Sequence, residues 1–421
     1  MKQLICPLLL ILTALPTTGR ADDWPFFRGP ARDGVSSDTQ VPLQWGKDNN
    51  VVWRVPLPQT GNSSPIIAKG KVFLTCAQDK QGRRRALYCF DRATGKELWS
   101  KVVTWDPADP THPENPYCGS TPATDGQRVI VWHGSAGLYC YDLDGHELWH
   151  KDLGPFRHIW GYASSPIIHG DRVYLNGGPG ARSFVVALDK TNGTILWQTD
   201  EPGGAPDRDA QHPDWLGSWS TPLVTTLDGK EQLLVFQPLH VNAYDLDTGK
   251  VLWTHGGAGL LAYTDVVIGD VAGAGKLGVA MAGYGGKAVG FKLGGSGDTS
   301  ATHRLWQSTA KPPQRIGSGI ILDSHLYIPN ENGIECLDPL TGKSIWSHRI
   351  PGQTFWSSLI AASGRLYATS QKGTTFVFEA NPTTWKLLAT NDLGEHTNAT
   401  PAISDHQLFI RTWQALYCIG G

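Results

Sequence analysis

The residue types best suited to binding a ligand gather in a few long segments between hydrophobic runs. These segments are 106–118, 156–162, 201–219, 256–265, 311–315, 353–356 and 394–398. Aromatic side chains with a few polar groups among them are the usual lining of a small-molecule site. The candidate ligand-binding residues in these segments are Glu114, Asn115, Tyr117, His158, Trp160, Tyr162, His212, Asp214, Trp215, Trp219, Arg315, Trp356 and His396.

Two catalytic chemistries are compatible with the same segments. Histidines there could bind a transition metal, but scattered loop histidines are more often solvated or packed, so we expect no metal site; they are His112, His158, His212 and His396. A glycosidase with paired carboxylates stays open as an alternative, because only the carboxylate separation decides it; the candidates are Glu114, Asp207, Asp209 and Asp214. No residue is singled out as catalytic.

These segments are spaced by an internal repeat. Its unit is an Asp, a Thr-Gly turn and a Trp, as in Asp91–Trp99, and it returns at 189–197, 245–253 and 338–346. A shortened copy ends at Trp149, His303–Trp306 keeps the Trp after a decayed turn, and Leu388 replaces the Trp in another copy. A small-residue or Ser/Thr-Pro start precedes each unit, and short β-branched runs lie between. Each unit therefore predicts four strands.

Four-stranded units at this period stack into a propeller, because no unit can bury both of its faces alone. Seven full units start near Ser64, Thr121, Ser165, Thr221, Asp265, Ser318 and Ser358. The start at Thr400 has three strands only, and Trp53 lies on a strand with no preceding unit. Joining these two pieces predicts an all-β, eight-bladed β-propeller of four-stranded antiparallel blades, with the last blade closed by the N-terminal strand.

The best copy of the repeat, Ala243–Trp253, resembles the tryptophan-docking motif of pyrroloquinoline-quinone (PQQ)-like β-propeller proteins. The resemblance covers about residues 51–419. It implies that each Trp stacks flat on a turn of the neighbouring blade. The structural docking residues it implies are Trp53, Trp99, Trp149, Trp197, Trp253, Trp306 and Trp346.

The opening Trp24–Gly34 is similar to that of exported bacterial propellers, which are broadly related to the propeller of the outer-membrane β-barrel assembly machine. This resemblance implies a scaffold that binds a ligand, a protein or a carbohydrate through its loop-rich mouth. The alternative is a PQQ-dependent dehydrogenase of the alcohol or sugar type. It would need a Trp floor (Trp160 or Trp215), calcium held by a carboxylate (Glu114 or Asp214) and an amide, and an Asp base. The adjacent cysteines of its alcohol-oxidising members are missing, so we favour the binding scaffold, without a cofactor, over the enzyme.

Composition restricts the partners and the location. The net charge is −2 without a long basic run, so nucleic acid is not an expected partner. No apolar run is long enough to span a membrane. Residues 1–21 resemble a signal peptide, with Lys2 before the apolar run Leu4–Leu15. We expect a soluble exported monomer, periplasmic or secreted, with residues 22–50 as a lead-in across the rim and 51–421 as the propeller.

The cysteines follow the repeat register. Cys89, Cys140, Cys336 and Cys418 occupy the Ala position of the docking motif, where a small buried side chain suffices. Cys76 lies beside Cys89, so a disulfide between them stays open. Cys118 falls in a loop, and we expect its thiol to be accessible.

Overall fold

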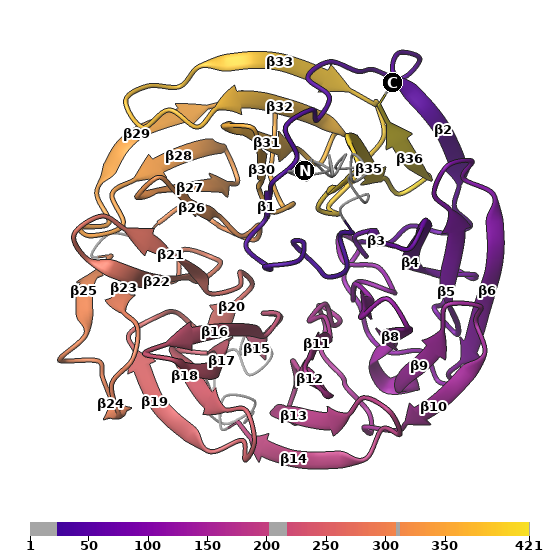
Figure 1. Ribbon diagram of the computed structural model, residues 1–421, viewed down its shortest axis with the longest axis horizontal. Helices are drawn as coiled ribbons and strands as arrows, with labels where there is room; N and C mark the ends of the chain where they lie inside the picture. Colours follow the sequence, from indigo (N-terminus) through magenta and orange to yellow (C-terminus); the bar gives the residue numbers. More distant parts are fainter. Residues whose placement is uncertain (1–22, 202–216, 309–311, 421) are drawn as a thin grey trace, which may run out of the picture.

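The computed structural model describes residues 23–201, 217–308 and 312–420. This part of the chain contains 36 β-strands and one short 3-10 helix, Gly134–Ala136. The strands form eight blades of four antiparallel strands around a common axis (Figure 1), and two of the blades carry a fifth, parallel strand, so the predicted eight-bladed β-propeller is confirmed. The described residues form no helix of the length and apolarity needed to cross a membrane. The predicted signal peptide, residues 1–21, lies outside the described residues.

Seven blades are built from strands that follow one another along the chain and pair antiparallel. Blade 1 contains β3 (Ile66–Ala68), β4 (Lys71–Ala77), β5 (Arg84–Asp91) and β6 (Glu97–Thr104), and blade 2 contains β7 (Ala123–Thr124), β8 (Arg128–Trp132), β9 (Leu138–Asp142) and β10 (Glu147–Lys151). Blade 3 contains β11 (Ile167–His169), β12 (Arg172–Gly177), β13 (Phe184–Asp189) and β14 (Ile195–Asp200), and blade 4 contains β16 (Leu223–Leu227), β17 (Lys230–Gln237), β18 (His240–Asp245) and β19 (Val251–Gly256). Blades 5 to 7 contain β21 (Val267–Val271), β22 (Gly275–Met281), β23 (Ala288–Lys292), β25 (Arg304–Gln307); β26 (Ile320–Leu322), β27 (His325–Asn330), β28 (Gly333–Leu337), β29 (Ser344–Arg349); and β30 (Ile360–Ala362), β31 (Arg365–Thr369), β32 (Thr374–Glu379), β33 (Leu387–Asp392).

Blade 8 joins the two ends of the chain. Three of its strands are C-terminal: β34 (Ala402–Ser404), β35 (Gln407–Arg411) and β36 (Ala415–Ile419). Its outer strand is β2 (Val51–Pro56), which pairs antiparallel with β36, so that Arg54 lies opposite Tyr417. This closure confirms the predicted split blade, and it pairs the strand edges that an open ring would expose.

Four short strands add three parallel pairs to this ring. β1 (Val35–Ser36) pairs with β30 of blade 7, and β24 (Gly297–Asp298) pairs with β19 of blade 4. β15 (Gly217–Ser218) pairs with β20 (Leu261–Ala262) before blades 4 and 5.

Docking tryptophans join most neighbouring blades, as the repeat predicts. The Trp99 indole N–H of blade 1 donates to the Leu143 carbonyl in the turn of blade 2, at 3.1 Å. Gly145 in that turn has a φ of +85°, and a Cβ there would lie 2.8 Å from the Trp99 ring. A glycine therefore lets the ring lie flat on the turn. The same indole-to-carbonyl bond is made by Trp53, Trp149, Trp197, Trp306 and Trp346.

Two interfaces lack this contact. Trp253 of blade 4 is fully buried, but its indole N–H donates to Gln232 of its own blade. Trp253 would dock on the turn between β23 and β25 of blade 5, where the repeat motif has decayed. β24 lies in this β23–β25 connection and pairs with β19 instead. At the interface of blades 7 and 8, Leu388 replaces the Trp, and the corresponding turn of blade 8 is the gap between the two chain ends. The Trp45 backbone N–H and the Leu43 carbonyl bond to Asn391 there.

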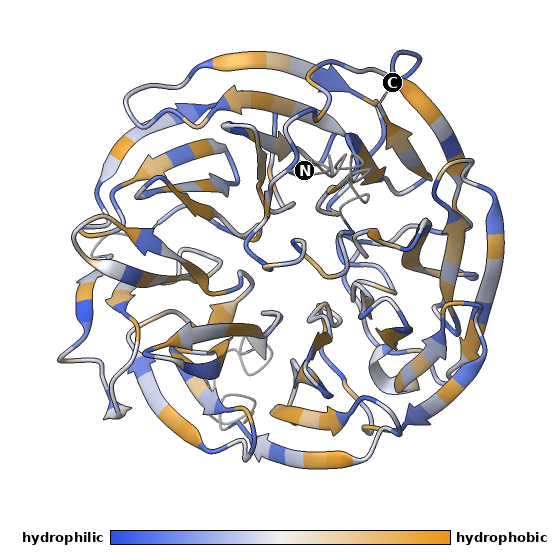
Figure 2. Ribbon diagram, viewed as in Figure 1, coloured by the Kyte–Doolittle hydropathy of each residue, from blue (hydrophilic) through white to orange (hydrophobic). Residues whose placement is uncertain are grey.

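The hydrophobic core lies between and within the blades. Figure 2 shows apolar residues concentrated along the strands, with polar residues in most connections. One cluster joins Val72 and Leu74 of blade 1 to Leu408 and Ile410 of blade 8. All six described cysteines are buried and unpaired, which leaves Cys76 and Cys89 without a disulfide. The expected accessibility of Cys118 is wrong, because its residue is 1% exposed.

The N-terminal lead-in crosses the centre of the ring rather than running over its rim alone (Figure 1). Trp24 exchanges two backbone hydrogen bonds with Ile67 of blade 1, and the Pro25 carbonyl accepts from Thr124 of blade 2. The Arg32 guanidinium donates to the Ile168 carbonyl of blade 3. The Gly34 carbonyl accepts from Ala361 of blade 7. We call residues 24–34 the plug.

Candidate functional site

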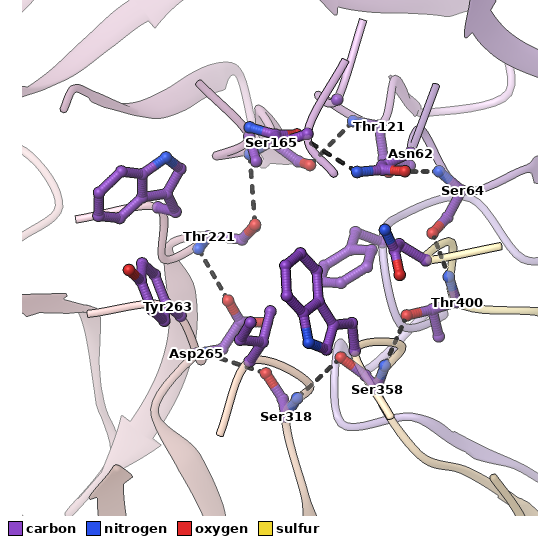
Figure 3. Close-up of a pocket in the computed structure, with 18 of the residues that line it drawn as sticks. Asn62, Ser64, Thr121, Ser165, Thr221, Tyr263, Asp265, Ser318, Ser358 and Thr400 are labelled. Atoms are coloured by element: carbon purple, nitrogen blue, oxygen red, sulfur yellow. Dashed lines mark hydrogen bonds between the residues drawn. The ribbon is translucent and has the colours of Figure 1, made fainter. Parts of the chain in front are cut away.

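A circle of hydrogen bonds surrounds the axis of the propeller. Each blade places one short polar side chain two residues before its inner strand, and this side chain accepts the backbone N–H of its counterpart in the preceding blade, at 2.8–3.3 Å. Figure 3 shows the circle closed. We call it the belt; its members are Ser64, Thr121, Ser165, Thr221, Asp265, Ser318, Ser358 and Thr400.

Asp265 is the one carboxylate in the belt. Arg28 of the plug lies 3.8 Å from it, and the two side chains are 2% and 9% exposed. Arg28 also donates to the carbonyls of Asp33 and Gly319, which fixes it beneath the belt. Burial raises the pKa of Asp265 to about 6, although Arg28 and the Thr221 N–H act to lower it.

The belt forms the floor of a pocket of about 170 Å³. All eight belt residues line it, together with Phe27 of the plug. Because the plug bonds to inner strands on several sides of the ring, it closes the axis below the belt. The pocket lies on the side of the loops that precede the inner strands, the face where the sequence predicts a site.

Aromatic residues form one part of the pocket wall. Trp160 stacks on Tyr284, with ring centroids 5.5 Å apart and planes 10° apart. Trp219 and Tyr263 pack edge-to-face beside them, at 5.0 Å. Trp356 lines the pocket as well, on the loop before blade 7. Such rings offer apolar faces for a ligand with a flat, weakly polar surface.

Amides and a carboxylate form another part of the wall. The Glu114 backbone carbonyl accepts from the side-chain amides of Asn62 and Asn398, at 2.8 and 3.0 Å. Its carboxylate accepts from Gln371 at 3.1 Å. Asn115 donates to the Trp160 carbonyl at 2.7 Å, which ties the polar wall to the aromatic wall.

A buried ion pair positions the loop that carries Glu114. The Arg85 guanidinium, from β5, lies 2.8 Å from Asp109, and the side chains are 0% and 4% exposed. Asp109 also accepts from Ser135, and Arg85 donates to the Gly82 and His133 carbonyls. Because both charges are buried and hydrogen-bonded, this loop is held to blades 1 and 2.

The structure brings five of the predicted ligand-binding residues together in the pocket wall: Glu114, Asn115, Trp160, Trp219 and Trp356. His396 lies just behind them, with its Nε2 3.1 Å from the Glu114 carboxylate and its ring against Trp413. His112, considered as a metal ligand, also lines the pocket.

Four others lie outside the pocket lining. His158 is buried against Trp219, and Tyr162 is buried against Trp132. Tyr117 lies over the Arg85 guanidinium. Arg315 is buried and bonded to Glu335. These four side chains support the loops that carry the wall.

The remaining predictions fall outside the described residues: His212, Asp214 and Trp215, with Asp207 and Asp209. Sequence reasoning in turn missed several lining residues. Asn62 and Asn398 stand just before belt residues, where the Ser/Thr-Pro pattern had indicated only a strand start. Tyr284 lies in the turn between β22 and β23, away from the segments singled out.

The described wall contains the carboxylate and amide groups that calcium with PQQ would need, but these groups are engaged with one another or with Arg28. Calcium takes about six to eight oxygen ligands. The Glu114 carboxylate is approached by the Gln371 and Asn398 amide nitrogens, and Asp265 is approached by Arg28. No group of three or more His, Cys, Asp or Glu side chains among residues 23–201, 217–308 and 312–420 is placed to hold a metal.

Known proteins resemble the chain in repeat type and fold. Residues 83–274 match the family described as outer membrane protein assembly factor BamB. Tetrathionate hydrolase of Acidithiobacillus ferrooxidans is 21% identical over 366 residues, which cover 77% of this chain and 66% of that protein, just under two thirds of its length.

Solved structures share the fold. A europium-containing methanol dehydrogenase superposes with a TM-score of 0.66 at 13% identity, covering 92% of this chain and 89% of that one. BamB from Moraxella catarrhalis gives 0.59 at 15% identity, covering 88% and 97%. Quinohemoprotein alcohol dehydrogenase from Comamonas testosteroni gives 0.65 at 12%, covering 94% and 80%. The repeats and these matches together show the fold, an eight-bladed β-propeller, and a similarity in repeat type to the matched family over residues 83–274.

Proposed function

We propose that this propeller is a non-catalytic binding protein whose pocket holds a saccharide. One observation carries the proposal: the pocket combines the aromatic rings of Trp160, Trp219 and Trp356 with amide and carboxylate groups in its wall, around a hydroxyl-lined floor. A sugar ring has an apolar face of C–H groups and an edge of hydroxyls. The two walls offer a complementary surface to each.

The engagement of the pocket's described carboxylates favours binding over catalysis. Glu114 is held by amide donors, and Asp265 accepts the Thr221 N–H and lies beside Arg28. A glycosidase would need one carboxyl group to protonate a leaving oxygen and a second to act across the sugar ring. In the proposed role, both carboxylates bind and orient the ligand.

The test is a binding screen of the purified mature chain against methyl glucoside, glucuronate and their oligomers, by saturation-transfer NMR followed by calorimetry. We expect saturable binding that the Trp356→Ala variant lowers at least tenfold. Trp385→Ala is the matched control, because Trp385 packs on Phe378 away from the pocket. If no saccharide binds, or if both variants weaken binding equally, the proposal is wrong.

The alternative, a PQQ-dependent oxidoreductase, is tested with the same purified protein. Titration with PQQ in excess calcium should give no heat and no thermal shift if the scaffold proposal is right. Saturable one-to-one binding that disappears without calcium would instead support a PQQ-dependent oxidoreductase and justify a dye-linked alcohol assay.

The proposed setting is outside the cytoplasm, either periplasmic or secreted. The signal-like residues 1–21 support export. A monomer is supported by the closed ring, because each blade's sheet is complete without a second chain. Processing after residue 21, read by N-terminal sequencing of the exported protein, and sedimentation as a single chain are the expected results.

A further inference from the structure

The belt leaves a set of hydroxyl hydrogens unassigned. Seven of its members are Ser or Thr, and each hydroxyl oxygen already accepts a backbone N–H. A hydroxyl also carries one hydrogen to donate. Within the described chain, none of these seven hydroxyls donates to a protein acceptor, and all seven line the pocket. The floor therefore presents a ring of donors toward the ligand.

A buried cation lies beneath that ring. Arg28 is 2% exposed, and its Nε is buried without a hydrogen-bond partner. Its pKa is lowered, chiefly because burial disfavours the charged form, although Asp265 and Asp33 act to raise it. A guanidinium in such surroundings gains from any further negative charge that comes near it.

Asp265 balances this cation only in its ionised form. When it is protonated, the belt gains an eighth O–H group, and the positive charge of Arg28 is offset only by Asp33, the weaker of the two influences. The belt then combines hydroxyl donors with a local excess of positive charge, which is the arrangement that favours an anionic oxygen group.

We propose that the belt is the seat for an oxyanion, so that the saccharide is an acidic one and its carboxylate or sulfate group points down the axis onto the belt. This inference rests on the proposed function, since it names the class of saccharide and its orientation. The aromatic wall then packs against the sugar ring. Glu114 lies in the wall supplied by loop 105–118, where it meets sugar hydroxyls rather than the acid group.

Protonation of Asp265 makes this seat sensitive to pH. The charged and titratable groups around it are Arg28 below the belt, Asp33 beyond Arg28, and His112, Glu114, Tyr263 and Tyr284 in the pocket wall. Because burial raises the pKa of Asp265 to about 6, the carboxyl is mostly neutral at pH 5 and mostly ionised at pH 7.5. An anion should therefore bind more tightly at pH 5.

Calorimetry with three probes tests the seat: glucuronate, glucose and inorganic sulfate, each at pH 5 and pH 7.5. We expect glucuronate to bind more than tenfold tighter at pH 5 than at pH 7.5, and glucose to bind equally at both. Because one group with a pKa of about 6 controls the binding, the affinity for glucuronate can change by about thirtyfold at most between these two pH values. Sulfate should bind saturably at pH 5 and compete with glucuronate.

Two substitutions separate the two floor charges. Asp265→Asn should bind glucuronate tightly at both pH values, whereas Arg28→Gln should weaken it at least tenfold at pH 5. Arg172→Gln is the matched control, because Arg172 pairs with Asp247 on the surface, far along the chain from the plug. Circular dichroism and thermal unfolding check that each variant is folded. If Arg28→Gln does not fold, Asp265→Asn alone tests the inference.

The inference is overturned if glucuronate and glucose bind alike at pH 5, or if Asp265→Asn keeps the pH dependence of the wild type. Its failure is distinguishable from that of the proposed function. Glucose binding that depends on Trp356 but is independent of pH and Arg28 would keep the saccharide pocket and remove the anion seat. Sulfate binding that depends on Arg28 without any saccharide binding would keep the seat and remove the saccharide proposal.

Discussion

The two ends of the propeller axis are closed by different means. At the plug, a single segment lies across the ring and bonds largely through its backbone, as in the two bonds between Trp24 and Ile67. At the mouth, separate loops from several blades contribute side chains and leave a pocket between them. Backbone pairing is insensitive to most side-chain changes, whereas the pocket depends on each side chain. The plug thus relies mainly on backbone bonds, and the pocket mainly on side chains.

Replacing a tryptophan by alanine at the plug gives the largest expected loss of stability, and the same replacement at the mouth is compared with it below. Trp24 is 2% exposed in the core between blades 1 and 8. Trp24→Ala should lower the free energy of unfolding by about 4 kcal/mol, because it removes a buried aromatic side chain. Chemical denaturation measures this loss. A change below about 1 kcal/mol would mean that the plug adds little to the fold.

The acidity of Asp265 gives the second largest effect. Its folded pKa of about 6 lies above the ordinary 3.8, so the folded state binds more protons between these pH values. This contribution to stability is full below about pH 4 and is lost as the pH rises through 6; it amounts to about 3 kcal/mol. Denaturation of the wild type and Asp265→Asn across this range should show a shallower slope for the variant. Equal slopes would contradict the assigned pKa.

At the mouth, Trp356→Ala should act on the ligand rather than on the fold. Trp356 is only partly buried, so we expect less than about 1 kcal/mol of lost stability, together with a loss of saccharide affinity near 1.4 kcal/mol, about tenfold. Parallel denaturation and calorimetry measure both. A large loss of stability would erase the contrast with Trp24.

The smallest effect is expected where the lead-in leaves the plug. Asp38 accepts from the His406 backbone and side chain of blade 8. The hydrogen bond to Asp38 raises the pKa of His406. Burial acts to raise the pKa of Asp38, but the hydrogen bonds from Gln40 and His406 have the larger effect, so the pKa of Asp38 is lowered. The contact between Asp38 and His406 therefore contributes its full stability between about pH 4 and 6.5, the ordinary pKa values of the two groups.

Asp38→Asn should raise hydrogen exchange of residues 35–40 only a few-fold, because this contact is partly exposed. In the wild type, the protection factors of the same residues, which remove the intrinsic pH dependence of exchange, should fall as the pH increases above the His406 pKa. The protection factors of loop 105–118 at the mouth should not change. A change there would mean that the two ends are coupled.

The repeat explains why so much of the fold could be predicted. Trp99 and Gly145 belong to adjacent copies of one motif, so each copy predicts the contact made by the next. The exceptions arise where a copy decays. Trp253 faces a turn replaced by the connection that contains β24, and a sequence pattern does not reveal which segment will substitute for a lost partner.

The pocket was less predictable, because its residues come from positions with different local roles. The loop residues Trp160 and Trp356 were found from their unusual content. Ser64 and Thr400 carried only the signature of a strand start, although the folded ring turns these starts into one belt. Arg28 was part of a recognised opening motif, but its place beneath Asp265 depends on a path across the ring that no local pattern specifies.

The seam in blade 8 has a consequence for the order of events during folding. Arg54 and Tyr417 are partners across 363 residues, and β36, which pairs with β2, is the last of the described strands along the chain. Until these two strands pair, the ring is an open arc with two unpaired edges, and contacts of such long range are slow to form. The pairing of β2 with β36 is therefore expected to be the slow step that closes the ring, after the other blades have formed from strands near one another along the chain.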